Sequence, residues 1–409
     1  MRKLFPTEER KSYMKKLLLI LLAVCLVFAG AVGYMSYKGV LPGTDAAEAT
    51  DDAAATETPA AQTIDYAAIY ALHEPDEVVM TADGKDVTWG EYFYMLYSQG
   101  QQVSQYMQYM SYYGMSAAWT DDVGDGSGET YAQYVVESAE RSVKQLAAIE
   151  GFAEENKVEL TEQNLADIET QRQEDITASC GEGADEAAFE EYLASIYLTP
   201  EGYDWINTTN QLYQQSYIQI YGENGELYSD ESAMQYLTDN GYIAANHILI
   251  STVDAGTGAA LDEAAKAEKK ATADKLYAEL SAITDKEALL KRFKELKEEY
   301  CEDSGKTKYP DGYTFTPGTM ATEFETACNA LEDYGLSEPV ESSYGYHIIL
   351  RLPLDVDGTI EYSDEGTALT ARSKGANSDY GAKLQAYLDT ETVKYADGFE
   401  KIDLLEYLK

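Results

Sequence analysis

The chain has 409 residues, more than one ordinary hydrophobic core organises, so its length predicts two or three domains. Hydrophobic residues make up 45% of the chain and tyrosine alone contributes 35 residues, which excludes wholesale disorder. A formal net charge of −43 would be repelled by phosphate backbones, so we expect no nucleic-acid partner. The four cysteines form no CxxC pair, which argues against a disulfide scaffold and against a zinc ribbon.

The N-terminus predicts a membrane anchor. Residues 1–16 are basic, whereas residues 17–37 carry no charge and are long enough to span a bilayer as a transmembrane helix. The basic segment then stays in the cytoplasm, and the bulk of this single-pass cell-membrane protein is extracytoplasmic. A cleaved signal peptide is the alternative, because residues 29–31 read Ala-Gly-Ala. Lipidation of Cys25 is disfavoured by the apolar residues that follow it. Residues 38–75 are predicted to be an acidic, Ala- and Thr-rich linker.

A mainly helical domain is predicted at residues 76–240. Two short strands around an Asp-Gly turn open it, and Thr88 with Glu91 has the spacing of a helix capping box. The segment that follows is rich in tyrosine and methionine. These side chains either pack against neighbouring helices or form an adaptable surface for unfolded chains.

A different pattern occupies residues 241–355 and predicts an α+β unit. An apolar strand comes first, followed by two helical periods at 261–280 and 285–300. Thr284 and Glu287 predict a capping box for the second helix. A loop, a third helix and two strands complete the unit, so we expect a small antiparallel sheet with surrounding helices.

Two of the three histidines of the chain lie in the middle of strands of this unit, at His247 and His347. A buried neutral imidazole needs partners for both ring nitrogens, so the two rings are expected to bond to each other or to nearby polar groups. No further histidine is present in the unit to complete a zinc site. A Ser or Cys nucleophile also lacks support, since there is no GxSxG motif and neither Cys301 nor Cys328 lies in a recognised context.

Five blocks within residues 241–353 together resemble the parvulin-type peptidyl-prolyl isomerase domain. They are N-HILI at 246–250, G-x-M-x-x-x-FE at 318–325, AL at 330–331, S-x-PV at 337–340 and YGYHIIL at 344–350. The anchor and the helical region are similar to extracytoplasmic foldases of the PrsA and SurA type. That resemblance implies an isomerase domain inserted in a chaperone-like domain, to which the C-terminal helical segment 365–409 returns.

The resemblance also assigns roles to individual residues. It implies that His247, Asp303 and His347 are catalytic, and that the substrate-binding residues are Phe315, Met320, Phe324, Ser342 and Tyr344. It implies no cofactor and no metal. One departure is the segment YPDGYTF at 309–315, where the family usually has Gly-Gly-Asp-Leu-Gly before the phenylalanine, so a leucine expected to line the proline pocket is missing.

The resemblance implies a membrane-tethered foldase that catalyses cis/trans isomerisation of X-Pro bonds in exported proteins. Its partners would be unfolded or newly exported polypeptides that contain proline, and the membrane through the N-terminal helix. The alternative is a non-catalytic holdase with a degenerate parvulin domain that binds extended peptides. A solute-binding lipoprotein is disfavoured, because the lipidation motif is poor and the two-lobed α/β alternation is lacking.

Overall fold

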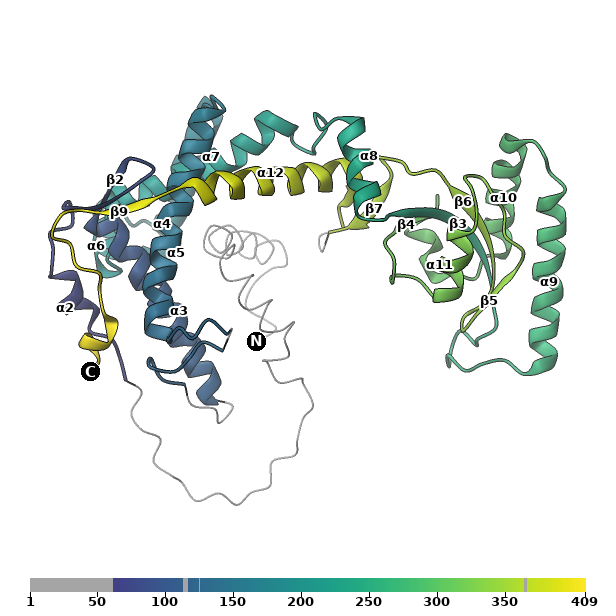
Figure 1. The fold of residues 1–409 in the computed structure, drawn as a ribbon, viewed down its shortest axis with the longest axis horizontal. Helices are drawn as coiled ribbons and strands as arrows, with labels where there is room; N and C mark the ends of the chain where they lie inside the picture. Colours follow the sequence, from purple (N-terminus) through teal and green to yellow (C-terminus); the bar gives the residue numbers. More distant parts are fainter. Residues whose placement is uncertain (1–61, 113–116, 125, 364–365) are drawn as a thin grey trace, which may run out of the picture. The chain divides into compact units, whose positions relative to one another are not determined.

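The computed structural model describes residues 62–112, 117–124, 126–363 and 366–409 (Figure 1). The basic segment 1–16, the predicted anchor 17–37 and most of the predicted linker lie outside these ranges. Among the helices that the structure does describe, none combines the length and the apolar character needed to cross a bilayer.

The described residues fall into two compact units, and each is treated by itself. The first unit is built from both ends of the chain, up to Ser216 and again from Ala382 to Lys409. The second unit is the continuous segment Tyr217–Gly381. Two helices, α7 (Pro200–Tyr221) and α12 (Ala371–Thr390), run from one unit into the other.

The first unit is mainly helical. Its elements, besides most of α7 and the end of α12, are α2 (Tyr66–Tyr70), β1 (Val78–Ala82), β2 (Lys85–Thr88), α3 (Trp89–Tyr112), α4 (Tyr131–Glu155), α5 (Glu162–Cys180), α6 (Glu186–Ser195), β9 (Val393–Tyr395) and η2 (Leu404–Tyr407). The expected hairpin is present, since β1 and β2 pair antiparallel around Asp83 and Gly84, which both have the positive φ that a tight hairpin turn requires.

The helix α3 begins with the expected capping box. Glu91 accepts a hydrogen bond from the Thr88 amide at 2.8 Å, and the Glu91 amide donates to Thr88 Oγ1 at 3.4 Å. The first turns of α3 then bury Trp89, Tyr92 and Phe93 in the core of the unit. This aromatic cluster anchors α3 against α4.

Strand β9 joins the two ends of the chain in one sheet. The strand order is β2-β1-β9, and β9 pairs antiparallel with β1. Figure 1 shows the yellow C-terminal strand beside the purple N-terminal strands. The C-terminal residues also close onto the start of the unit, because the Lys409 amide donates to the Thr63 carbonyl at 2.8 Å.

Residues 62–75 belong to this folded unit, although the sequence placed them in the linker 38–75. Ile64, Tyr66 and Ile69 are buried in the core with Trp89. The short helix α2 is capped by Asp65, whose side chain accepts from the Ala68 amide. The segment is too short to show a helical period in the sequence, but it buries these three apolar side chains in the core.

The second unit is an α+β unit. Its elements, after the end of α7, are α8 (Asp230–Asp239), β3 (Ile243–Ser251), α9 (Glu263–Ser281), α10 (Lys286–Tyr300), η1 (Ser304–Thr307), β4 (Tyr313–Phe315), α11 (Thr322–Asn329), β5 (Val340–Ser342), β6 (Gly345–Leu352), β7 (Thr359–Tyr362) and β8 (Ala368–Thr370), followed by the start of α12. Strands β7 and β8 form a separate two-stranded ladder.

The main sheet of the second unit has the order β4-β3-β6-β5 with every pair antiparallel. Ile248 and Ile348 lie directly opposite each other and pack on the side of α9 and α10. Ile243 and Ile349 point to the other face, where α11 covers them. Figure 1 shows the helices α9 and α10 on one side of the sheet and α11 on the other. Both faces of β3 and β6 are therefore buried, which explains their nearly continuous apolar sequences.

Two local expectations for this unit were wrong. Asp285, not Thr284, caps α10, since the Asp285 side chain accepts from the Ala288 amide at 2.9 Å. The strand β4 was predicted as loop, because three residues are too few to show a period of two. β4 pairs with residues 243–245 at the beginning of β3.

Candidate active site

The two central strands place both histidines on the same face of the sheet. In the antiparallel register His247 lies opposite Ile349, and His347 lies opposite Leu249. The histidines are therefore diagonal neighbours on the face that α11 covers. Their rings are nearly parallel, with centroids 5.3 Å apart, and both residues are buried.

Asp303 lies near the histidines because the chain after α10 runs beside the later part of β3, which β4 does not cover. The Glu302 amide donates to the Leu249 carbonyl at 2.9 Å, and the Leu249 amide donates to Cys301 Sγ at 3.4 Å. The next residue is Asp303, which also caps η1 through Gly305. A main-chain connection to β3 thus fixes the carboxylate beside His247.

Four side chains form a continuous line of hydrogen bonds across the site. His247 Nε2 lies 3.2 Å from Asp303 Oδ2, and His247 Nδ1 lies 3.1 Å from His347 Nδ1. At the other end His347 Nε2 lies 2.7 Å from Ser342 Oγ. Every ring nitrogen of the two histidines has a partner, as expected for buried imidazoles.

The line has one consistent arrangement of protons when both rings are neutral. An ionised Asp303 only accepts, so His247 carries its proton on Nε2 and accepts at Nδ1. His347 must then donate from Nδ1 and accept at Nε2 from the Ser342 hydroxyl. The Tyr344 amide completes the series by donating to Ser342 Oγ at 3.1 Å. All donors therefore point toward Asp303.

The electrostatics agree with this arrangement. Burial lowers the pKa of His347 to about 3, and the neighbouring His247 lowers it further, so the His347 ring is neutral at ordinary pH. Burial alone would raise the pKa of Asp303. Hydrogen bonds from His247, from Tyr313 and from the Gly305 amide outweigh burial and hold the pKa of this carboxyl well below its usual range.

An apolar wall stands against the histidine pair. The Phe324 ring from α11 meets His247 and His347 nearly edge to face, at centroid distances of 5.2 and 5.4 Å. Phe315 from β4 lies 5.9 Å from Phe324, and Met320 packs against the same cluster. The structure therefore brings Phe315, Met320 and Phe324 into one apolar cluster, in which the Phe324 ring contacts both imidazoles.

Ser342 and Tyr344 lie differently from each other. The Ser342 hydroxyl bonds to His347, as described above. The Tyr344 side chain is 58% exposed, and its backbone amide, not its ring, is what contacts the polar line.

Two residues near the site were missed by the sequence analysis. Tyr313 donates from its hydroxyl to Asp303 Oδ2 at 2.5 Å, and its ring stands at 90° to the His247 ring. Lys297 is 1% exposed and donates from Nζ to the backbone carbonyls of Tyr309 and Pro310. A lysine inside the apolar stripe of α10 was a visible signal, whereas nothing near Tyr313 in the sequence indicated its partner.

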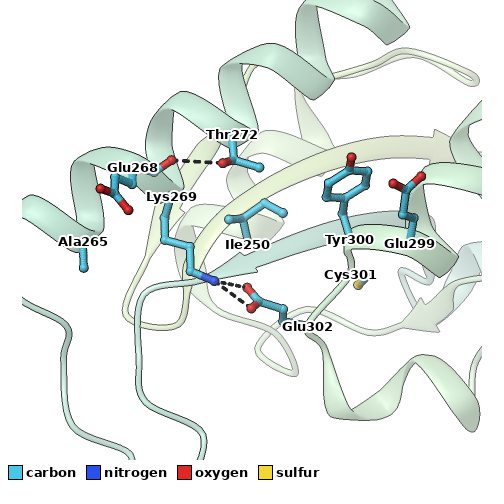
Figure 2. A pocket seen from close by; sticks show the side chains of 9 residues that line it. All are labelled: Ile250, Ala265, Glu268, Lys269, Thr272, Glu299, Tyr300, Cys301 and Glu302. Atoms are coloured by element: carbon cyan, nitrogen blue, oxygen red, sulfur yellow. Dashed lines mark hydrogen bonds and ion pairs between the residues drawn. The ribbon is translucent and has the colours of Figure 1, made fainter.

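The hollow in Figure 2 lies on the opposite face of the sheet, where α9 and α10 pack, and not at the histidines. Its volume is about 450 Å³. An ion pair from Lys269 to both carboxylate oxygens of Glu302, at 2.7 and 2.8 Å, crosses its rim. It is lined by Ile250, Ala265, Glu268, Lys269, Thr272, Glu299, Tyr300, Cys301 and Glu302.

The structure shows neither a disulfide nor a metal-ligand cluster within the residues it describes. Cys180, Cys301 and Cys328 are free thiols. No group of three or more His, Cys, Asp or Glu side chains in these ranges is arranged to hold a metal ion.

Residues 247–352 match the family model described as Rotamase: PPIC-type PPIASE domain. This part of the chain is a PPIC-type peptidyl-prolyl isomerase domain. The resemblance to parvulin-type isomerases is thereby confirmed for the segment that carries both histidines and the residues between them.

Curated relatives share sequence with limited parts of the chain. Foldase protein PrsA 1 of Bacillus cereus is 50% identical over 60 residues, which are 14% of this chain and 21% of the relative. Foldase protein PrsA of Halalkalibacterium halodurans is 33% identical over 134 residues, or 32% of each chain. Chaperone SurA of Bordetella avium is 31% identical over 109 residues, 25% of this chain and 22% of the relative. The matched part therefore spans a fifth to a third of these relatives.

Among solved structures, PrsA from Bacillus subtilis is similar at 20% identity over 77% of this chain and 91% of that chain, with a TM-score of 0.24. PrsA from Bacillus anthracis is similar at 17% identity over 61% and 94%, with a TM-score of 0.21.

Proposed function

We propose that the chain is a foldase whose isomerase domain accelerates cis/trans isomerisation of X-Pro bonds in unfolded client polypeptides. The observation that carries this proposal is the ordered line from Asp303 through His247 and His347 to Ser342, beside the aromatic ring of Phe324. The relatives named foldase and chaperone support the choice of unfolded polypeptides as clients.

Rotation about an X-Pro bond requires neither a nucleophile nor a metal ion. The C–N bond has partial double-bond character, and rotation about it passes a barrier of about 18–20 kcal/mol. No covalent bond forms or breaks. The twisted amide at the top of the barrier is less polarised than the planar amide, so an apolar surround favours it over the ground state.

In this proposal Phe315, Met320 and Phe324 hold the pyrrolidine ring and exclude water from the amide. The histidine line is a set of dipoles that are already oriented and need no reorganisation during rotation. A thousandfold acceleration requires about 4 kcal/mol, because each factor of ten corresponds to about 1.4 kcal/mol. Burial of one proline ring together with one or two oriented hydrogen bonds is of this size.

The test measures cis/trans exchange of a short X-Pro peptide by NMR in the presence of the full-length chain. We expect acceleration by the wild type and at least a tenfold smaller rate constant for His347→Asn. The matched control is His73→Asn, which changes a histidine of the other unit that lies beside Trp89 and Phe399. Absence of acceleration by the wild type, or equal rates for all three proteins, would overturn the proposal.

We also infer from the sequence that the foldase works outside the cytoplasm, tethered by residues 17–37. Cells that produce the full chain should retain it in the membrane fraction after alkaline washing. A mature protein whose mass places its N-terminus near residue 32 would instead show that a signal peptide has been cleaved.

A non-catalytic holdase is the second candidate. The observation that favours it is the altered segment 309–315, which lacks the leucine that the family resemblance leads us to expect in the proline pocket. A holdase suppresses aggregation of a client without changing the rate of its proline-limited refolding. Measuring both quantities with one client separates the two functions.

A further inference from the structure

The Asp303 carboxylate accepts two hydrogen bonds besides the one from His247. Oδ2 lies 3.2 Å from His247 Nε2 and only 2.5 Å from the Tyr313 hydroxyl, while Oδ1 accepts from the Gly305 amide at 3.2 Å. Tyr313 and His247 therefore donate to the same oxygen atom. The phenol approaches from β4, and it reaches the carboxylate independently of the histidines.

Two glycines near Tyr313, Gly305 and Gly312, stand at positions where a side chain would clash. A Cβ added at Gly305 would lie 2.0 Å from the Tyr313 hydroxyl oxygen, so only glycine fits there. Gly312 has φ +112°, and a Cβ there would lie 2.7 Å from the Ala245 carbonyl oxygen. Gly312 thus lets the segment approach β3, and Gly305 leaves room for the phenol beside Asp303.

Lys297 holds the segment that presents Tyr313. Its Nζ donates to the carbonyls of Tyr309 and Pro310 at 3.0 and 2.9 Å, and burial lowers the pKa of this ammonium. A buried ammonium is costly unless polar groups solvate it, so the two carbonyls are held in place as much as the lysine is. The Tyr309 ring packs against the Tyr313 ring, with centroids 4.8 Å apart and the ring planes tilted by 35°.

Other contacts fix the chain on the far side of Asp303. Lys306 Nζ donates to the Cys301 carbonyl at 2.7 Å, and Glu302 accepts from the Ser251 amide at 2.7 Å. The ion pair from Lys269 holds Glu302 from the hollow of Figure 2. The backbone at 301–303 is therefore anchored without Tyr313, which leaves the phenol free to act on the carboxylate itself.

We propose that Tyr313 is a positioning residue for the histidine pair and that Lys297 secures the segment presenting it. This inference rests on the proposed isomerase function and adds a residue to it. The phenol keeps Asp303 ionised and fixes the rotamer in which Oδ2 faces His247. Through that oxygen it determines which nitrogen of each imidazole carries the proton.

The direction of the proton line depends on this choice. If Asp303 were neutral or turned away, His247 would lose the acceptor for its Nε2 proton. A proton on His247 Nδ1 would then force the His347 proton to Nε2, because the two Nδ1 atoms are 3.1 Å apart. Ser342 would have to accept from His347 instead of donating. Tyr313 therefore selects one of the two opposite directions in which the hydrogen-bond donors of the line can point.

The experiment compares Tyr313→Phe with the wild-type full-length chain and with Tyr309→Phe as the matched control. Tyr309→Phe removes a phenol hydroxyl from the same segment without touching Asp303. Imidazole ¹⁵N shifts report the tautomers, and the ¹³C shift of the Asp303 carboxyl reports its titration. For the wild type we expect protons on His247 Nε2 and His347 Nδ1. For Tyr313→Phe we expect a higher Asp303 pKa, mixed tautomers and about a tenfold lower kcat/KM, the scale of one hydrogen bond to a charged group.

Unchanged tautomers and an unchanged Asp303 titration in Tyr313→Phe would overturn the inference, and so would equal changes in Tyr309→Phe. If Tyr313→Phe fails to fold, 3-fluorotyrosine at position 313 keeps the ring and makes the phenol more acidic. It should lower the Asp303 pKa further, and no shift would count against the inference. The NMR readouts need no turnover, so an inactive wild type would sink the isomerase proposal while the role of Tyr313 is still decided.

Discussion

Replacing Asp303 by asparagine gives the sharpest test of how the polar line stabilises the second unit. Asparagine keeps the shape of the side chain and an acceptor oxygen but removes the charge. The Asp303 side chain is 18% exposed and accepts from two side chains and one backbone amide. A hydrogen bond to a charged group contributes about 1.5–3 kcal/mol. Because the amide oxygen still accepts, we expect a net loss of about 2 kcal/mol at neutral pH.

The pH dependence of this loss follows from the depressed pKa of Asp303. A carboxyl with a lower pKa in the folded state stabilises that state above the unfolded pKa, about 3.9. The contribution is lost as the pH falls through the folded value. The difference in unfolding free energy between wild type and Asp303→Asn should therefore be constant above about pH 5 and shrink progressively below pH 4.

The assay must report on the second unit, and tryptophan fluorescence does not, since Trp89, Trp119 and Trp205 all belong to the first unit. Amide hydrogen exchange in β3 and β6 reports the correct unit. Asp311→Asn is the control, because Asp311 lies in the same stretch of chain but its side chain is 86% exposed. A free-energy difference that stays the same at pH 3 and pH 7 would refute the reasoning.

Three further outcomes are expected. Phe324→Ala should destabilise the second unit by about 3–5 kcal/mol, since Phe324 is 3% exposed. A loss of unfolding free energy under about 1 kcal/mol, measured by amide exchange, would contradict this and show that the neighbouring side chains repack to fill the cavity. Burial is the main cause that raises the pKa of Glu391, and the Asp83 carboxylate adds to it, while Lys144 and Lys85 act in the opposite direction. This group therefore stabilises the first unit at low pH. The stabilisation is lost as the pH rises through the raised pKa. Glu391→Gln should flatten this dependence in urea unfolding followed by tryptophan fluorescence, and an unaltered profile would contradict it. Burial raises the pKa of Cys328 to about 12, so this thiol should resist alkylation at pH 8 until urea unfolds the second unit, and rapid labelling of the folded chain would contradict that burial.

The sequence predicted those parts of the site in which residue type and periodicity carry the information. Two histidines inside apolar strands had to find polar partners, and the structure pairs His247 with His347. The helices α9 and α10 followed from their apolar periods. Asp303 was reached only through the family resemblance, because a carboxylate in a loop has no periodicity that identifies its partner.

The features that the sequence did not reveal depend on tertiary contacts. Tyr313 bonds to Asp303 because β4 pairs with β3, and a strand of three residues leaves no recognisable pattern. The choice of Asp285 over Thr284 as a helix cap depends on where one turn begins. Residues 64–70 look like linker until the core that receives them is known.

The pairing of β9 with β1 has a consequence for the order in which the protein is assembled. Synthesis delivers β9 last, so the sheet of the first unit cannot close until residues 217–381 have already emerged. The second unit is one uninterrupted stretch and has all of its strands beforehand. A nascent chain released before Val393 would thus contain the complete isomerase domain, while the first unit would still lack β9 and one edge of β1 would be unpaired.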